Sequence, residues 1–147
     1  MDLLSLVPTL CLRQHGGMKP PLPKGAGPPD RWLSQIEVQL RGQPRDVVAI
    51  AYLDAQEEMV ALRVSAEGDA GASLLPLRDI LRDVLDNDPA SLVLAHNHPS
   101  GNPQPSQTDK RATQTLCAML RPLGVNIADH IILAGDDRIS FRDLGLL

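Results

Sequence analysis

Two histidines and an aspartate in one short stretch are of the residue types that bind metal ions. His96 and His98 stand two residues apart where an apolar run ends, and Asp109 follows after a proline-rich loop. Because side chains at i and i+2 of a strand project to the same side, both imidazoles can approach one ion. Two nitrogens and one carboxylate oxygen leave one position of a tetrahedral zinc ion open, which is typical of catalytic zinc. The spacing therefore predicts a zinc site whose bound water supplies hydroxide near neutral pH.

The same residues also have structural explanations. Ser106 and Asp109 have the spacing of a capping box, in which the serine caps a helix and the acid in the first turn suits its dipole. A His-x-His pair without further ligands is often a coincidence. We favour a metal site because all of these residues fall within positions 96–109, with turn residues between them.

The elements that must position this stretch are predicted from apolar periodicity. Helical spacing appears at 77–85 and 107–120, and more weakly at 32–40. The segment 69–73 is interpreted as a loop or a degenerate edge strand. Strands that alternate with two helices favour an α/β domain with a mixed sheet. The expected strands are 47–53, 59–64, 91–95, 127–134 and 139–141.

The first 31 residues differ in composition from the rest of the chain. Prolines and glycines are concentrated there without any apolar period, so we expect a flexible leader over 1–31 and one folded domain over 32–147. A proline interrupts the short apolar start, which also carries an acid, and this is unlike a secretion signal. No apolar run approaches the roughly 20 residues of a membrane span. We expect a cytoplasmic protein without a membrane partner.

Composition excludes several other classes of function. The net charge is −4 and aromatic residues make up 2% of the chain, so direct binding of nucleic acid is disfavoured. The two cysteines are far apart and form no C-x-x-C pattern, which excludes a disulfide framework and a thiolate zinc site. A zinc nucleobase deaminase needs His-x-Glu and Pro-Cys-x-x-Cys, and neither is present.

The complete motif resembles that of a known enzyme family. His96-x-His98-Pro99 followed by Ser106-x-x-Asp109 is similar to the JAMM (MPN+) metalloprotease motif, and the fuller form resembles its RadC branch. The similarity covers roughly residues 45–147. It implies a RadC-like JAB domain with a cytidine-deaminase-like, three-layer α/β/α fold around a mixed sheet. It also implies zinc held by His96, His98 and Asp109, with Ser106 supporting the tetrahedral intermediate. Such proteins usually carry an N-terminal helix-hairpin-helix region, which the short, proline-rich leader is not expected to provide.

The resemblance also assigns two acidic residues. A family glutamate before the first core strand hydrogen-bonds the zinc-bound water and acts as general base, and Asp46 stands at the matching position. Asp79 matches a second family acid, in the helix before the motif strand. Both are one methylene shorter than glutamate, and a base must lie within about 2.6–3.2 Å of the proton it takes or act through one water. The alternative is that Asp46 is an exposed acid at a strand entrance.

Two further polar residues are interpreted from their positions. His130, at the start of a strand, is expected to be structural rather than a ligand, and Asn97 is expected to shape the loop around the ion or orient a substrate carbonyl.

The leading functional hypothesis is a zinc metallopeptidase or isopeptidase that acts on a protein or peptide. Asp46 and Ser106 would be its catalytic residues. The alternatives are a catalytically weak or inactive module that binds a protein, and a DNA-repair accessory, which rests on the family name alone.

Overall fold

The computed structural model describes residues 30–66 and 75–147. The predicted loop at 69–73 and nearly all of the predicted leader lie outside the described residues. In chain order the elements are α1 (Asp30–Leu40), β1 (Val47–Leu53), β2 (Met59–Ala66), α2 (Leu77–Asn87), β3 (Ser91–Asn97), α3 (Gln107–Leu120), the 3₁₀ turn η3 (Arg121–Leu123), β4 (Asn126–Ala134) and β5 (Asp137–Ser140).

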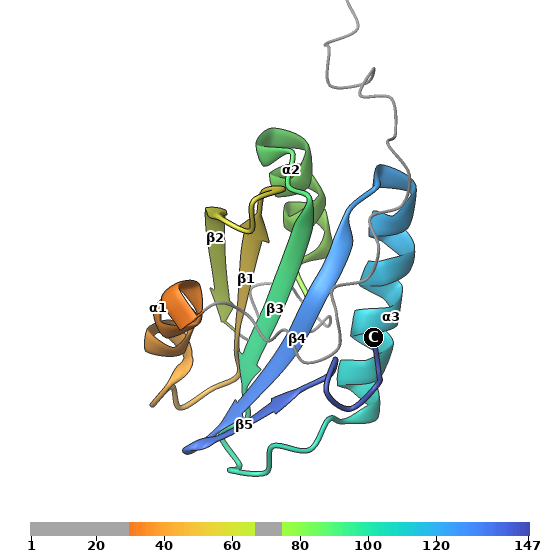
Figure 1. Ribbon diagram of the computed structural model, residues 1–147. Coiled ribbons are helices and arrows are strands. Elements are labelled where there is room, and N and C mark those ends of the chain that lie inside the picture. The colour runs from red at the N-terminus through yellow and green to blue at the C-terminus, as the bar shows by residue number, and fades with distance from the viewer. Residues whose placement is uncertain (1–29, 67–74) are drawn as a thin grey trace, which may run out of the picture.

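The five strands form one mixed sheet in the order β2-β1-β3-β4-β5 (Figure 1). β3 and β4 are parallel, and the other neighbouring pairs are antiparallel. Parallel neighbours need a crossover connection, and α3 provides it between the end of β3 and the start of β4. The N-terminus of α3 is thereby returned to the end of the sheet where β3 finishes.

Helices cover both faces of the sheet. One core cluster joins α1 to alternate residues of the central strands, such as Val93 and Ala95 of β3. The other joins α2 and α3 to the residues in between, such as Leu92 and Leu94. This alternation is what a strand buried on both faces requires, since successive side chains point to opposite sides. The predicted three-layer α/β/α architecture with a mixed sheet is confirmed.

Hydrogen-bonded pairing extends some elements beyond their apolar patterns. β3 was expected to end at Ala95 but continues to Asn97, because His96 pairs with Val48 of β1 and Asn97 with Leu133 of β4. The last strand lies at Asp137–Ser140 rather than 139–141, because it follows the turn from β4. Among the described residues, no helix has the length and apolar character needed to cross a membrane.

Candidate metal centre

His96 lies at the buried end of β3, on the face that packs against α2 and α3. It continues the side of the strand that carries Leu92 and Leu94, and only 1% of its surface is exposed. His98 follows just beyond the strand and is partly exposed. Their Nε2 atoms lie 2.8 Å apart. The i, i+2 spacing therefore brings both rings to one point, as the sequence predicted.

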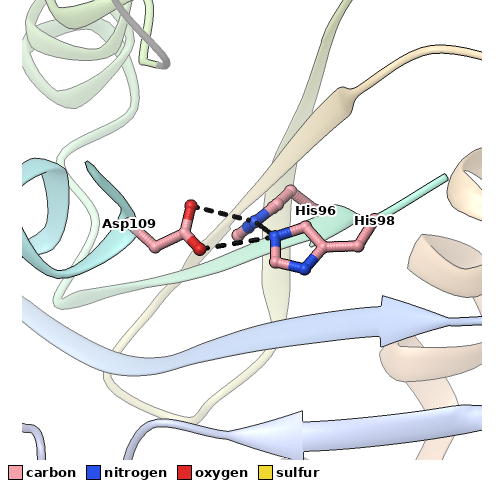
Figure 2. A group of neighbouring side chains, drawn as sticks. All are labelled: His96, His98 and Asp109. Carbon is pink, nitrogen blue, oxygen red and sulfur yellow. Dashed lines mark hydrogen bonds and ion pairs between the residues drawn. The ribbon is translucent and has the colours of Figure 1, made fainter. Parts of the chain in front are cut away.

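Asp109 reaches the same point from the first turn of α3. Ser106 is the N-cap: its Oγ accepts a hydrogen bond from the Asp109 amide at 3.0 Å, and Asp109 Oδ2 accepts one from the Ser106 amide at 2.7 Å. The same carboxylate places Oδ1 3.2 Å from His96 Nε2 and Oδ2 3.3 Å from His98 Nε2 (Figure 2). The capping box and the metal-ligand arrangement thus coexist, since the cap orients the carboxylate toward the two rings.

The loop after His98 determines which of its ring nitrogens carries the proton. His98 Nδ1 lies 2.7 Å from the carbonyl oxygen of Asn102, and a carbonyl can only accept, so Nδ1 must donate. The Nε2 of the neutral ring then presents a lone pair to the cluster. Gly101 makes this turn possible because its φ of +81° lies in the left-handed region that glycine adopts without strain.

The carboxylate of Asp109 is held in its charged form. Burial alone would raise its pKa, but the hydrogen bond and charge of His96 and the hydrogen bond from the Ser106 amide lower it well below its usual range. Asp109 is therefore an anionic oxygen ligand at neutral pH.

The donor set of His96, His98 and Asp109 fits a metal ion. One ligand atom from each residue can be chosen so that all three lie within 4.8 Å of one another. Bonds of about 2.0–2.2 Å at tetrahedral angles separate ligand atoms by roughly 3.3 Å, close to the two carboxylate-to-imidazole distances given above. The two Nε2 atoms are 2.8 Å apart, so the rings would have to separate slightly to hold an ion. A cation placed between the ligand atoms would receive one lone pair from each of the three residues. This group can therefore bind a metal ion.

The cluster opens into a pocket of about 610 Å³, within the size range of small-molecule and substrate sites. Asp46, half-buried just before β1, lines this pocket together with all three candidate ligands and Ser106. The complete lining is Pro44, Arg45, Asp46, His96, His98, Pro99, Ser100, Asn102, Gln104, Ser106, Thr108 and Asp109.

Asn97 positions the segment that carries Asp46 and does not line the pocket. Its Oδ1 accepts a hydrogen bond from the Val47 amide at 2.6 Å, and its Nδ2 donates to the carbonyls of Arg45 at 2.9 Å and Gln43 at 3.3 Å. Because successive strand residues face opposite sides, Asn97 points away from the ring of His96. Asn97 thus shapes the segment beside Asp46 rather than the loop after His98, and it is not among the residues that line the pocket and could orient a substrate carbonyl there.

Asp79 is not brought into the site. Its carboxylate pairs with Arg82 on the same helix at 3.1 Å and with Arg63 of β2 at 4.0 Å, and it does not line the pocket. Asp79 was matched to a family acid by its position in the sequence, but the structure does not place it beside the candidate ligands.

His130, on β4, lies behind His96 and does not join the ligand group. Its Nε2 is 2.8 Å from His96 Nδ1, on the side of the ring away from Asp109. Burial, together with the neighbouring charge of His96, lowers the pKa of His130 to about 3, so the ring is neutral at physiological pH. Thr113, which sequence reasoning missed, contacts the other nitrogen of His130. The sequence could have indicated Thr113 through helical spacing, because it lies one turn after Asp109 on the same face of α3.

Comparison with known proteins identifies the family of the folded region. A family model for the RadC-like JAB domain matches residues 28–146. A UPF0758 protein of Pseudoalteromonas translucida (strain TAC 125) is 33% identical over 119 residues, which are 81% of this chain and 53% of that protein. One from Albidiferax ferrireducens is 35% identical over the same length, covering 81% and 51%. One from Vibrio cholerae is 32% identical over 112 residues, covering 76% and 70%.

The chain spans about half the length of the first two of these relatives. The matched region includes the whole sheet, the His-x-His pair and the start of α3. The resemblance suggested by the motif is thus confirmed over the folded region, and the chain belongs to the family of RadC-like JAB domains.

Proposed function

We propose that this domain is a zinc-dependent hydrolase that cleaves a peptide or isopeptide-like amide bond. The observation that carries the proposal is the convergence of His96, His98 and Asp109 at an open pocket, with a fourth side of the cluster left to the pocket. A structural zinc site would use all four positions for protein ligands, whereas a catalytic one keeps a position for water or substrate.

The three ligands would hold the zinc ion at the base of the pocket. When bound there, zinc makes a coordinated water acidic near neutral pH and polarises the carbonyl of the substrate. The carboxylate of Asp109 offsets part of the ion's charge. The ordered backbone of β3 and the capping box of α3 keep the ligands in place without substrate, which lowers the reorganisation needed during the reaction.

Asp46 is the proposed general base. It lines the same pocket as the ligands, and its segment is held to β3 by the hydrogen bonds of Asn97. In the reaction Asp46 takes the proton of the attacking water and then returns it to the leaving amine. This side chain is one methylene shorter than glutamate, so the rigid hold on its backbone is important for reach.

Ser106 is the proposed oxyanion donor. Because its Oγ accepts the amide hydrogen of Asp109 in the helix cap, the hydroxyl proton is left to donate elsewhere. Ser106 also lines the pocket. A donor held at this position stabilises the negative charge that develops on the carbonyl oxygen of the amide.

The pocket suits a polypeptide better than an apolar small molecule. Its lining is rich in proline, hydroxyl, amide and charged side chains, which match the polar backbone of an extended peptide. The overall charge of −4 gives no support to direct binding of nucleic acid. We therefore propose a protein or peptide as the substrate.

The second candidate is a module that keeps the metal and binds a protein without cleaving it. It is favoured by one observation, the shorter acid at position 46. In this case the pocket would serve as a recognition site and Asp46 would not need to reach a proton.

Metal analysis and an amide-cleavage assay distinguish the two candidates. We expect one zinc per chain in the purified protein and slow hydrolysis of a panel of peptide and isopeptide substrates. The hydrolysis should be lost in Asp46→Asn with zinc retained. The matched control is Asp86→Asn, which removes an exposed carboxylate on α2 and should leave hydrolysis unchanged.

The variant Asp46→Glu completes the design. If Asp46 is a working base, the wild-type protein is active and the glutamate variant changes its rate. If only Asp46→Glu cleaves the substrates, the natural protein is the binding module, and if purified protein contains no zinc the metal site is wrong.

A further inference from the structure

We propose that Arg45 makes the pocket selective for polypeptides that carry a carboxylate close to the amide that is cleaved. The inference rests on the proposed hydrolase function and names the substrate class of the same pocket. The carboxylate can belong to an acidic side chain or to the C-terminal end of the substrate, since both present the same pair of charged oxygens. Arg45 precedes the proposed general base Asp46 in the sequence and has no part in the proposed reaction itself.

Arg45 is a cation in the pocket without a partner in the protein. Of the described residues that line the pocket, it is the only lysine or arginine. Its side chain is exposed, and within the described part of the chain its guanidinium bonds to no carboxylate or carbonyl, the adjacent Asp46 included. Three other arginines, Arg63, Arg82 and Arg138, have a carboxylate oxygen at 2.5, 3.1 and 3.8 Å respectively. The donors of Arg45 are therefore available to a ligand that enters the pocket.

The backbone of Arg45 is fixed next to the candidate ligands. Asn97, which stands between His96 and His98 in the sequence, donates its side-chain amide to the carbonyl oxygen of Arg45 at 2.9 Å. The same side chain accepts a hydrogen bond from the backbone amide two residues further on, at 2.6 Å. The guanidinium thus extends from a backbone that is tied to the histidine segment. Binding a ligand then costs mainly the ordering of the Arg45 side chain.

The charges in the pocket favour an anionic group once a divalent ion is bound. Asp46 and Asp109 contribute two carboxylates to the lining, and Arg45 together with such an ion outweighs them, so the pocket becomes net positive. The whole chain has a net charge of −4, which makes the occupied pocket a local positive region on an acidic molecule. Such a region raises the local concentration of an anionic substrate and its rate of association.

A guanidinium recognises a carboxylate by geometry as well as by charge. Its planar fork of N–H donors binds both oxygens at once, whereas a side-chain amide offers a single oxygen and no charge. Other polar groups of the lining are engaged within their own loop: Ser100 Oγ accepts from the Asn102 amide, and Asn102 Oδ1 accepts from the Gln104 amide. A substrate carboxylate beside the reacting amide therefore has Arg45 as its strongest side-chain partner.

Equilibrium binding of short peptides to the zinc-loaded protein, measured by calorimetry, tests this inference. One set of peptides is blocked at both ends and carries glutamate at successive positions. A second set carries glutamine at the same positions, and a third carries glutamine and has a free C-terminal carboxylate. We expect at least one of the two sets with a carboxylate to bind about 3–10-fold more tightly than the blocked glutamine set. The set that does so identifies the source of the carboxylate.

Variants of Arg45 assign the preference to this side chain. Arg45→Gln should remove the difference between the sets, and Arg45→Lys, which keeps the charge but loses the planar fork, should retain part of it. Because Arg45 is exposed, both variants should remain folded. The control Arg121→Gln removes an exposed arginine just after α3, with the same change in net charge, and should leave the preference unchanged.

Two results would overturn the inference. One is equal binding of all three peptide sets by the wild-type protein. The other is a carboxylate preference that Arg45→Gln keeps in full, which would assign the carboxylate to the ion instead. Neither readout requires hydrolysis, so a protein that prefers the carboxylate and cleaves no peptide would contradict the proposed function and leave this inference intact. A protein that cleaves peptides without any such preference would contradict this inference alone.

Discussion

Two polar clusters lie at opposite ends of the same face of the sheet, and they differ in how their charges are matched. At one end Arg63 of β2 donates to both oxygens of Asp83, at 2.5 and 2.8 Å, and Tyr52 donates its hydroxyl to Asp83 at 2.8 Å. At the other end His96, His98 and Asp109 face one another. The first cluster pairs a guanidinium and a hydroxyl with one carboxylate, whereas the second gathers three side chains that can each offer a ligand atom to a metal ion.

The pKa values record this difference for the first cluster. The hydrogen bond to Arg63 is the main cause that lowers the pKa of Asp83, and the same bond raises the pKa of Arg63. Each charge therefore stabilises the other, and the Tyr52–Arg63–Asp83 cluster is complete as folded. The cluster of His96, His98 and Asp109 contains no lysine or arginine, so a bound metal ion would supply a permanent positive charge that these side chains do not.

The two clusters are far enough apart to be tested separately. Tyr52 pairs with Leu92, and Val48 pairs with His96, four residues further along β3. At about 3.3 Å per residue the separation along the strand is roughly 13 Å, beyond the 7–10 Å at which substitutions usually couple. Ile50 and Leu94 fill the space between them.

The largest expected effect is from His98→Ala. Removing one of three ligands should weaken zinc binding by more than about 100-fold. That factor is the upper end of the range seen when a residue that only supports a ligand is replaced. His98 is partly exposed, so the variant should remain folded. Zinc content after dialysis against a chelator measures the effect. If this variant kept the wild-type zinc content, the His96, His98 and Asp109 cluster would not be the zinc site.

Zinc itself should stabilise the fold. At a free zinc concentration 100 times the dissociation constant, the free energy of unfolding should rise by about 2.7 kcal/mol. Thermal unfolding with zinc and with excess chelator gives the comparison. Asp83→Asn should keep the full increase, whereas His98→Ala should lose it. An equal increase in both variants would mean that zinc acts elsewhere.

Asp83→Asn should destabilise the protein without affecting the metal site. The amide still accepts from Tyr52 but leaves the charge of Arg63 only the 4.0 Å contact with Asp79, at a cost of about 1–3 kcal/mol. Urea unfolding measures this cost, and a zinc titration should give the wild-type affinity. A large fall in zinc affinity would show that the two clusters are coupled after all.

The smallest expected effect is a pH dependence of the Tyr52–Arg63–Asp83 cluster. Because the folded pKa of Asp83 is lowered, its contribution to stability is complete above its unfolded pKa of about 3.9 and is lost as pH falls through the folded value. The difference in unfolding free energy between wild type and Asp83→Asn should therefore narrow below about pH 4. Urea unfolding with chelator present gives this difference at each pH, and a gap that stayed constant would argue against the ion pair.

Much of the fold was predictable because its signals are local. The apolar run of β1 and the helical spacing of α3 each lie within one segment, and their predicted bounds match the structure. The extension of β3 through His96 and Asn97 was not predictable, since polar residues are held in the strand by pairing with β1 and β4. The misplaced Asp79 has a similar cause: the direction of a side chain on α2 depends on how the helix packs.

By itself, the sequence determined the α/β class with a mixed sheet and the group of candidate ligands, because these depend on short-range periodicity and on spacing within one continuous stretch. The three-layer arrangement was implied by the family resemblance that the motif carries. Only the tertiary structure decided which residues contact and position that group of candidate ligands. Asn97 holds the segment of Asp46, and Thr113 and His130 reach His96, through contacts between residues distant in the chain. Such contacts are set by the packing of α3 and β4 against β3, and no local pattern encodes the direction of a hydrogen bond.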